Sequence, residues 1–385
     1  MKVLLVSRWG VQCGIATYTD QLSLALIELG IDVEIAAEQY IGIKKINVQT
    51  KDVTVHRCWN GRKSSFTGIV NLVKKINPDA VHIQHEFGFM DEARTMIDLV
   101  SKTRPYAAIV VTPHTVIPHP SAKSWFYRSV LDKVGGVVAH NKAMAHALVD
   151  WKIPENNVFV IPHGTPSNCI KKDKKESRRR LYLPEDPSVI IAMSLGFITP
   201  GKMQYEAVEA IIYLVQEGVL DSKRFLYLIV GEPGQKDEQN IEYCRKIHEL
   251  IDKHRSWNYV RIIPRFVDRE DLPYYYGAAD FAITGSCQTF YSVSGRSHQE
   301  MAFGMPSVSS DVRLLSDLNE HQTMKYKTLY QLRSHILTLA RSSEYRSILS
   351  RRCTEVANET LWPNVAARHI KMYEAVIARM VSRKI

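Results

Sequence analysis

The sequence lacks the features that mark several large classes of protein. Its six cysteines are widely scattered and it has no C-x-x-C or H-x-x-x-H spacing, so we predict reduced thiols and no bound metal. No stretch approaches the ~18 apolar residues of a membrane span, and the apolar run at residues 1–6 is too short for a signal peptide. We therefore expect a cytoplasmic protein without a transmembrane segment.

Two common catalytic motifs are also missing. No G-x-S-x-G elbow stands between a predicted strand and a predicted helix, which argues against a Ser/His/Asp hydrolase. The loop GFITPGK at residues 196–202 ends in Gly-Lys, but Met203 stands where a P-loop needs Ser or Thr. The sequence therefore predicts neither a serine hydrolase nor a P-loop nucleotidase.

The composition indicates a globular protein with two domains and a basic surface. Of its 385 residues, 45% are hydrophobic and 23% are charged, which is enough for two cores of ordinary size. The net charge of +10 favours nucleic acid, an anionic membrane leaflet or a nucleotide-linked substrate as partner. A dense basic run contributes to this charge: Lys171, Lys172, Lys174, Lys175, Arg178, Arg179 and Arg180. Taken alone, the run is better interpreted as a solvated linker or helix start.

Short apolar runs alternate with amphipathic stretches along most of the chain, which predicts two parallel sheets covered by helices on both faces. In the first half, strands are predicted at residues 2–7, 32–37, 53–58, 80–84, 107–112, 136–139 and 158–161. In the second half they are predicted at 188–195, 225–230, 259–263 and 281–284, followed by a loop, a short helix and a strand within 288–311. After residue 311, helices are predicted at 328–341, 345–357 and 365–381, with no strands between them.

Polar residues at the ends of the predicted strands are the candidates for a site, because ligands bind at the carboxyl edge of an open sheet. In the first half they are Gly14, His85, Glu86, His114, His140, Asn141, His163 and Gly164. In the second half, Gly196 and Lys202 belong to a glycine loop that can approach a diphosphate. The helix start within residues 288–311 is a second candidate anion site, with an ordinary crossover helix as the alternative.

Several motifs occur in a fixed order across both halves of the chain. They are CGIATYT (13–19), QHEFGF (84–89), TPHT (112–115), IPHG (161–164), LGFITPGK (195–202), IVGEPG (229–234), FVDREDLPYYYGAADFAIT (266–284), MAFGMP (301–306) and LWPNVAARHIKMY (361–373). With these motifs the chain resembles glycosyltransferase family 4, whose members have the GT-B fold of two Rossmann-like domains facing a central cleft. The resemblance implies an acceptor domain at 1–165, a basic linker at 166–187, a nucleotide-sugar domain at 188–361 and a helix at 362–385 that crosses back to the first domain.

The resemblance implies an enzyme that transfers a sugar from a nucleoside diphosphate sugar, with retention of anomeric configuration and without a metal or other cofactor. His114 and Lys202 are the expected catalytic residues. The donor would be bound by Gly14, Gly196, Lys202, Arg265, Phe266, Val267, Ser292, Ser294, Gly295, Arg296, Gln299 and Glu300. The acceptor-side candidates are Thr17, His85, Glu86 and His163.

The segment at 288–311 departs from the family pattern. Family members commonly carry two glutamates here, and Tyr291 and Gln299 stand at those two positions. Glu300 lies one residue later, which turns its side chain by ~100° on a helix, so it does not simply replace the missing carboxylate. Two alternatives follow: a nucleotide-sugar epimerase or hydrolase of the same fold, and a sugar-nucleotide-binding protein without activity.

The basic residues of the predicted acceptor domain are compatible with more than one class of acceptor. Lys44, Lys45, Arg62, Lys63, Lys74 and Lys75 make the predicted acceptor domain basic. A lipid-linked sugar or a polysaccharide at the inner face of a membrane would suit this charge, and so would DNA with a modified base. We expect peripheral binding at an anionic membrane as the first option and DNA as the second.

Overall fold

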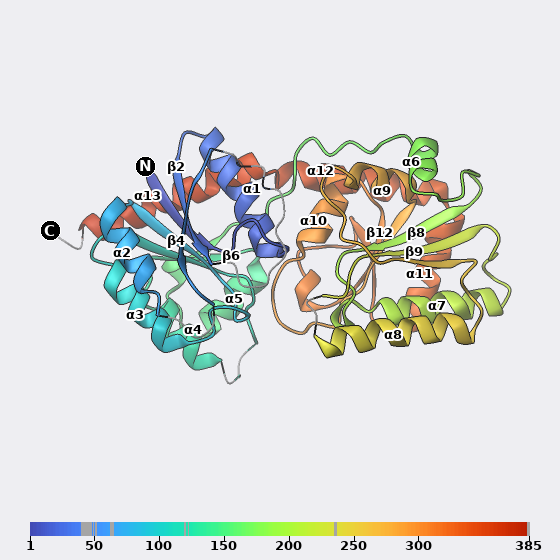
Figure 1. The fold of residues 1–385 in the computed structure, drawn as a ribbon, viewed down its shortest axis with the longest axis horizontal. Helices are drawn as coiled ribbons and strands as arrows, with labels where there is room; N and C mark the ends of the chain where they lie inside the picture. Colours follow the sequence, from blue (N-terminus) through green and yellow to red (C-terminus); the bar gives the residue numbers. More distant parts are fainter. Residues whose placement is uncertain are drawn as a thin grey trace. The chain divides into compact units, whose positions relative to one another are not determined.

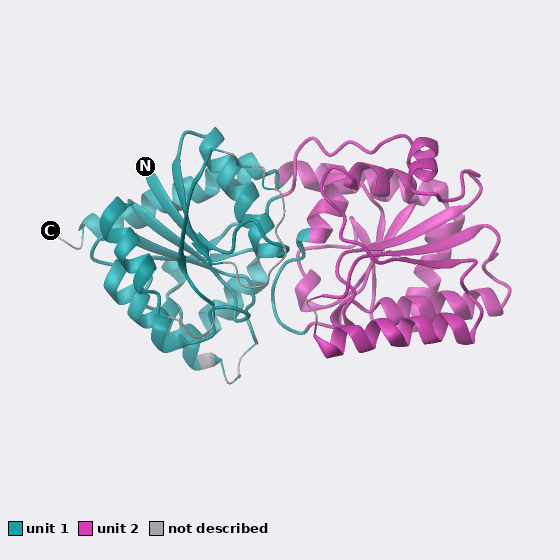
Figure 2. Cartoon of the chain, viewed as in Figure 1, with its two compact units in different colours: residues 1–164, 289–295, 360–385 teal, residues 165–288, 296–359 magenta. Residues whose placement is uncertain are grey.

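The computed structural model describes residues 1–39, 48, 50, 52–61, 65–118, 121, 123–234 and 237–382 (Figure 1). The basic residues Lys44, Lys45, Arg62 and Lys63 lie outside the described residues. The chain divides into two compact units (Figure 2). The first unit consists of Met1–Gly164, Thr289–Gly295 and Thr360–Ile385, and the second of Thr165–Gln288 and Arg296–Glu359.

The first unit is built around a parallel sheet. Over the part of the chain that the structure describes, the strand order is β3-β2-β1-β4-β5-β6-β7, and every neighbouring pair is parallel. Its elements are β1 (Lys2–Ser7), α1 (Gly14–Glu28), β2 (Asp32–Glu38), β3 (Thr54–Trp59), α2 (Thr67–Ile76), β4 (Ala80–His85), α3 (Ala93–Thr103), β5 (Ala108–Pro113), α4 (Ser124–Leu131), β6 (Gly136–Ala139), α5 (Lys142–Asp150), β7 (Val158–Val160) and α13 (Trp362–Ser382).

Helices cover both faces of this sheet, as the continuous apolar strands predict. One core gathers side chains of α2, α3, α4 and α5 against residues such as Val81 and Ile83 of β4. The other core gathers side chains of α1 and α13 against Ala80 of β4 and Val110 of β5. The helix that ends the chain is therefore one of only two described helices in the core on that face.

Helix α13 packs tightly on the first unit, beside α1 (Figure 1). The ring of Trp362 lies so close to Gly164 that a Cβ on this glycine would meet it at 2.1 Å. The Trp362 indole N–H donates to the side chain of Gln21 on α1. The predicted return of the last helix to the first domain is thus confirmed.

The second unit is built around another parallel sheet. Within its described residues the strand order is β10-β9-β8-β11-β12-β13, again parallel throughout. Its elements are α6 (Lys174–Arg180), β8 (Ile190–Leu195), α7 (Gln204–Gln216), β9 (Phe225–Val230), α8 (Glu238–Lys253), β10 (Val260–Ile263), α9 (Leu272–Ala278), β11 (Phe281–Thr284), α10 (Gly295–Ala302), β12 (Ser307–Ser310), β13 (Thr323–Tyr326), α11 (Leu329–Arg341) and α12 (Ser343–Glu359), where α10 starts at the last residue of the first unit. The predicted helices after residue 311 have no strand between them, but the sequence analysis missed β13, which extends the sheet before α11.

The basic run is a short helix that is held by the second unit. Asp173 caps α6 by accepting from the backbone N–H of Glu176. The guanidinium of Arg178 is fully buried, pairs with buried Asp280 at 3.0 Å and donates to several backbone carbonyls. Lys174 also pairs with Asp280, at 2.5 Å. Much of the charge that suggested a polyanion partner is therefore used within the unit.

The buried pair of Arg178 and Asp280 gives a direct test of the fold. Replacing Arg178 with Met removes one of the two cations that pair with Asp280 and leaves several backbone carbonyls without a donor. This change should lower the free energy of unfolding of the second unit by about 3–5 kcal/mol. The neighbouring change Arg179→Met removes only an exposed pair with Glu185 and should cost at most about 1 kcal/mol. Hydrogen exchange of the β8 and β11 amides measures both, and equal effects of the two changes would refute this account.

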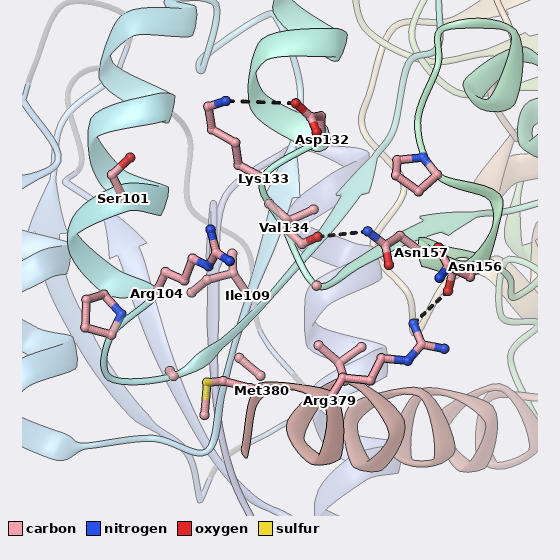
Figure 3. Close-up of a pocket in the computed structure, with 16 residues that line it drawn as sticks. Ser101, Arg104, Ile109, Asp132, Lys133, Val134, Asn156, Asn157, Arg379 and Met380 are labelled. Carbon is pink, nitrogen blue, oxygen red and sulfur yellow. Dashed lines mark hydrogen bonds and ion pairs between the residues drawn. The ribbon is translucent and has the colours of Figure 1, made fainter. Parts of the chain in front are cut away.

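A surface cavity of about 560 Å³ lies on the first unit at the amino ends of β5, β6 and β7 (Figure 3). Figure 3 shows Arg104 and Met380 at its wall, and Arg379 donating to the backbone carbonyl of Asn156 at 2.7 Å. This edge of the sheet is opposite to the carboxyl ends of the strands, where the sequence predicts the site. The cavity is therefore separate from the candidate active site.

Candidate active site

In the second unit, two glycines bring the loops after β8 and β9 together. Gly196 has a φ of +119°, in the range that favours glycine. A Cβ on Gly231 would lie 1.9 Å from the carbonyl oxygen of Gly196, so only glycine fits at this contact. The loop from Gly196 leads into a 3₁₀ turn at Pro200–Lys202. Close backbone approach of this kind is what a diphosphate-binding loop requires.

Arg296, in the first turn of α10, reaches the end of β8. Its guanidinium donates to the carbonyl of Leu195 at 3.1 Å and lies 3.5 Å from the carboxylate of Glu300. Glu300 is buried and accepts a hydrogen bond from Thr284 at 2.7 Å. Burial raises the pKa of Glu300, while Arg296 opposes that rise. Thr284 and Glu300 therefore fix Arg296 beside Gly196, at the N-terminus of a helix.

Lys202 lies in the same group of charges. Burial, together with the positive charge of Arg296, lowers the pKa of its ammonium to about 7. No hydrogen bond or ion pair of the ammonium is found among the described residues. Lys202 and Arg296 thus place two positive charges near one carboxylate, and a bound anion would relieve their repulsion.

The low pKa of Lys202 predicts a pH-dependent anion affinity. Below about pH 7 the ammonium is charged, and above it the proton is lost, so affinity for a nucleoside diphosphate sugar should fall from about pH 6 to about pH 8.5. A diphosphate diester has no proton to lose in this range, so the change reports on the protein. Titration calorimetry in buffers of different ionisation enthalpy should show proton uptake on binding at the high end.

The variant Lys202→Arg keeps its charge over the whole range and is the matched control for this pH dependence. Its affinity should be flat between about pH 6 and about pH 8.5. An equally steep decline in Lys202→Arg would show that another group is responsible.

The other predicted donor-side residues of the second unit either lie apart from Lys202 and Arg296 or already interact with another side chain. Arg265 pairs with Asp271 at 2.5 Å, and Val267 packs against the hydrophobic cluster to which α9 contributes side chains. The ring of Phe266 lies 6.3 Å from that of Phe197, in the glycine loop. Gln299 is half-buried and accepts from the hydroxyl of Tyr276 at 3.3 Å. The backbone and ring of Phe266 remain the better candidates for a base contact.

Four other predicted donor-side residues, Gly14, Ser292, Ser294 and Gly295, belong to the first unit. Tyr291 forms an antiparallel bridge with Val116, and the hydroxyl of Ser292 donates to the carbonyl of His114. Ser294 is buried, and Gly295 lies beside His163, whose Nε2 would be 3.3 Å from a Cβ on that glycine. Gly14 opens α1 and faces open space, with no atom within 4 Å of a Cβ placed there.

The histidines of the first unit gather around Tyr18 of α1. The rings of His114, His163 and Trp362 each lie 5.0–5.2 Å from the Tyr18 ring, edge to face. His140 follows at 5.5 Å. The hydroxyl of Tyr18 is buried without a hydrogen-bond partner among the described residues. Sequence reasoning missed Tyr18, although it stands within the CGIATYT motif.

His114 is a half-buried member of this cluster whose polar partner is another side chain. Its Nε2 lies 2.9 Å from the side-chain oxygen of Gln84. Burial, and the nearby histidines His140 and His85, lower its pKa well below the usual value. The imidazole is therefore neutral near pH 7, and it can exchange hydrogen bonds with a sugar hydroxyl but does not supply a positive charge.

The acceptor-side candidates have different surroundings. His85 is fully buried, donates to the carbonyl of Met90 at 2.9 Å and lies between the rings of Phe87 and Phe126. This place suits a core histidine better than an acceptor contact.

The other three acceptor-side candidates stand nearer the surface. Glu86 accepts from the hydroxyl of Thr115 at 2.7 Å, and Thr17 is exposed on α1. His163 is half-buried and contacts the carbonyl of Gly164 through Nδ1 at 2.7 Å. These three therefore remain the better acceptor candidates.

The buried histidines predict acid sensitivity of the first unit. Burial lowers the pKa of His85 and of His369 to about 4. Between about pH 6.5 and about pH 4 the unfolded chain binds protons that the folded unit does not, so stability falls as the pH falls, by roughly 3 kcal/mol for each histidine. Urea unfolding of His85→Gln at several pH values should show a slope reduced by about one proton. The exposed change His146→Gln should leave the slope as it is, and an unchanged slope in His85→Gln would contradict the assignment.

The described residues contain no cluster of three or more His, Cys, Asp or Glu side chains that could hold a metal. No helix among them has the length and hydrophobicity needed to cross a bilayer.

Comparison with known proteins identifies the class of fold. A family model described as Glycosyltransferase Family 4 matches residues 13–168, and no curated protein matches the sequence. A glycosyltransferase structure from Rickettsia africae ESF-5 is similar over 98% of both chains, with 18% identity and a TM-score of 0.78. Anabaena Alr3699/HepE in complex with UDP is similar over 98% of this chain and 100% of that one, with 15% identity and a TM-score of 0.74. The same Anabaena protein has also been solved with UDP-glucose, at 14% identity and a TM-score of 0.72.

These comparisons confirm the predicted fold class. The chain has the two-domain GT-B fold of glycosyltransferases, with a parallel sheet and flanking helices in each unit.

Proposed function

We propose that this chain transfers a hexose from a nucleoside diphosphate sugar to an acceptor hydroxyl, with retention of anomeric configuration and without a metal ion. The observation that carries the proposal is the pair of cations beside the glycine loop of the second unit. Arg296 lies beside Gly196 and 3.5 Å from Glu300, and the charges of Arg296 and Glu300 both act on Lys202. Such a pair matches the two negative charges on the diphosphate of the intact donor.

The cations would do the work of leaving-group stabilisation. When the bond from the sugar to the diphosphate breaks, negative charge develops on the departing phosphate oxygens. Lys202, Arg296 and the backbone N–H groups at the start of α10 can all stabilise that charge, which is the role a divalent ion takes in other transferases. Structures of the same fold that hold UDP or UDP-glucose support a nucleoside diphosphate sugar as donor.

The first unit supplies neutral groups for the sugar and the acceptor. His114, held by Gln84, is the candidate for contact with a sugar hydroxyl. Glu86, His163 and Thr17 are the candidates for the acceptor side. A lipid-linked sugar or a polysaccharide is the preferred acceptor, because α6 uses much of its basic charge internally and DNA loses that support.

The proposal is tested with a panel of uridine, guanosine and adenosine diphosphate sugars, with and without EDTA. At least one donor should bind and be turned over, EDTA should leave the rate unchanged, and the product should keep the anomeric configuration of the donor. Lys202→Met should weaken donor binding by about tenfold or more, since it removes a charge-assisted contact without changing the length of the side chain much. The exposed change Lys223→Met in the same unit is the control and should bind as the wild type does.

Five outcomes would contradict this proposal in whole or in part. Failure of every donor to bind would refute the proposal that the donor is a nucleotide sugar. Inverted product would refute retention, and loss of activity with EDTA would refute metal independence. An epimerised sugar formed without any acceptor would identify the epimerase alternative, while tight binding without turnover would identify the inactive binding protein that Tyr291 and Gln299 suggest.

A further inference from the structure

A row of buried polar side chains lies behind His114 in the first unit. Successive residues of a strand point to opposite faces of the sheet, and on β4 Val81 and Ile83 pack against α2 to α5. Ala80 packs on the other face, with α1 and α13. His82 and Gln84 share the parity of Ala80, so two polar side chains stand on a face that is otherwise a hydrophobic core.

These side chains form one continuous chain of hydrogen bonds. Tyr373 of α13 meets Nδ1 of His82 at 2.7 Å, and Thr112 of β5 meets Nε2 of His82 at 2.7 Å. The side-chain nitrogen of Gln84 lies 3.3 Å from the same Nε2, and its side-chain oxygen lies 2.9 Å from Nε2 of His114. The four residues behind His114 are all 0% exposed, so no water competes for these contacts.

The chemistry of the groups determines where the protons lie. The amide nitrogen of Gln84 can only donate, so Nε2 of His82 accepts, and a hydroxyl proton from Thr112 can point to the same lone pair. Burial and three neighbouring histidines lower the pKa of His82 well below the usual value, so its ring is neutral and carries its one proton on Nδ1, toward Tyr373. The amide oxygen of Gln84 can only accept, so Nε2 of His114 carries a proton.

We propose that Gln84 and His82 are positioning residues for His114: they hold its imidazole as the Nε2–H tautomer and leave Nδ1 to accept a hydrogen bond from a sugar hydroxyl. Nδ1 of His114 has no partner within the described ranges, and the ring is half-buried. The other tautomer would place a lone pair of His114 Nε2 against the side-chain oxygen of Gln84, and this contact would be repulsive. The identity of the hydroxyl rests on the proposed function, but the tautomer does not.

The tautomer is measured directly by nitrogen-15 spectroscopy of the histidine rings in the full chain. The signals of His114 are assigned by their absence from His114→Gln, and long-range couplings show which nitrogen carries the proton. Wild type should show a protonated Nε2 and an unprotonated Nδ1. A His114 that is mainly protonated on Nδ1 in the wild type would overturn the proposal, whether or not the protein transfers sugar.

Variants of Gln84 test whether this residue selects the tautomer of His114. Gln84→Leu removes the acceptor and should give a mixture of both tautomers of His114. Gln84→Glu keeps an acceptor in the same place and should keep the proton on Nε2. Gln21→Leu changes another buried glutamine of the same unit, which contacts Trp362 and not His114, and should keep the wild-type tautomer. An unchanged tautomer in Gln84→Leu would show that Gln84 does not select it.

Turnover gives the second readout. Gln84→Leu should lower kcat by about 10- to 100-fold while donor KM stays within about twofold, because the donor is held mainly by the second unit and only the orientation of His114 is lost. Gln84→Glu should recover most of this loss. A rise in KM with unchanged kcat would refute the positioning role. Absence of any turnover in the wild type would refute the proposed function alone, since the tautomer measurement still decides the positioning role.

Discussion

The docking of α13 on the first sheet is the interaction on which the first unit depends. Two helices make up the described helical part of the core on that face, α1 from the beginning of the chain and α13 from its end. The same helix completes the polar row, because the hydroxyl of Tyr373 satisfies His82 in a place that water does not reach. One helix thus closes the hydrophobic core and supplies a hydrogen-bond partner inside it.

The candidate residues of the two units differ in their electrostatics. In the second unit, Glu300 and Thr284 hold the positively charged Arg296 in place. In the first unit, burial makes the imidazoles neutral, and a hydrogen-bond network orients the ring of His114. Charge suits the departing diphosphate, whereas a neutral ring of fixed orientation suits a sugar hydroxyl.

The sequence was enough to predict the alternating elements, because apolar runs and glycines report on local structure. The return of the last helix was expected only from the family resemblance that the ordered motifs carry. It was not enough for β13, a four-residue edge strand with two partly exposed side chains. His85 was grouped with the acceptor side although its parity on β4 is that of Ile83, and the same alternation would have revealed His82 and Gln84. The assignment of Thr289–Gly295 to the first unit depends on long-range contacts that no local pattern reports.

The first unit is made from three separate segments of the chain, and this has a consequence for synthesis. Its last segment, Thr360–Ile385, leaves the ribosome after every residue of the second unit has been made. The face of the first sheet next to α1 therefore stays uncovered until α13 has been made. For that period the nascent protein exposes an apolar surface that chaperones recognise, and chains interrupted before α13 keep it exposed for good.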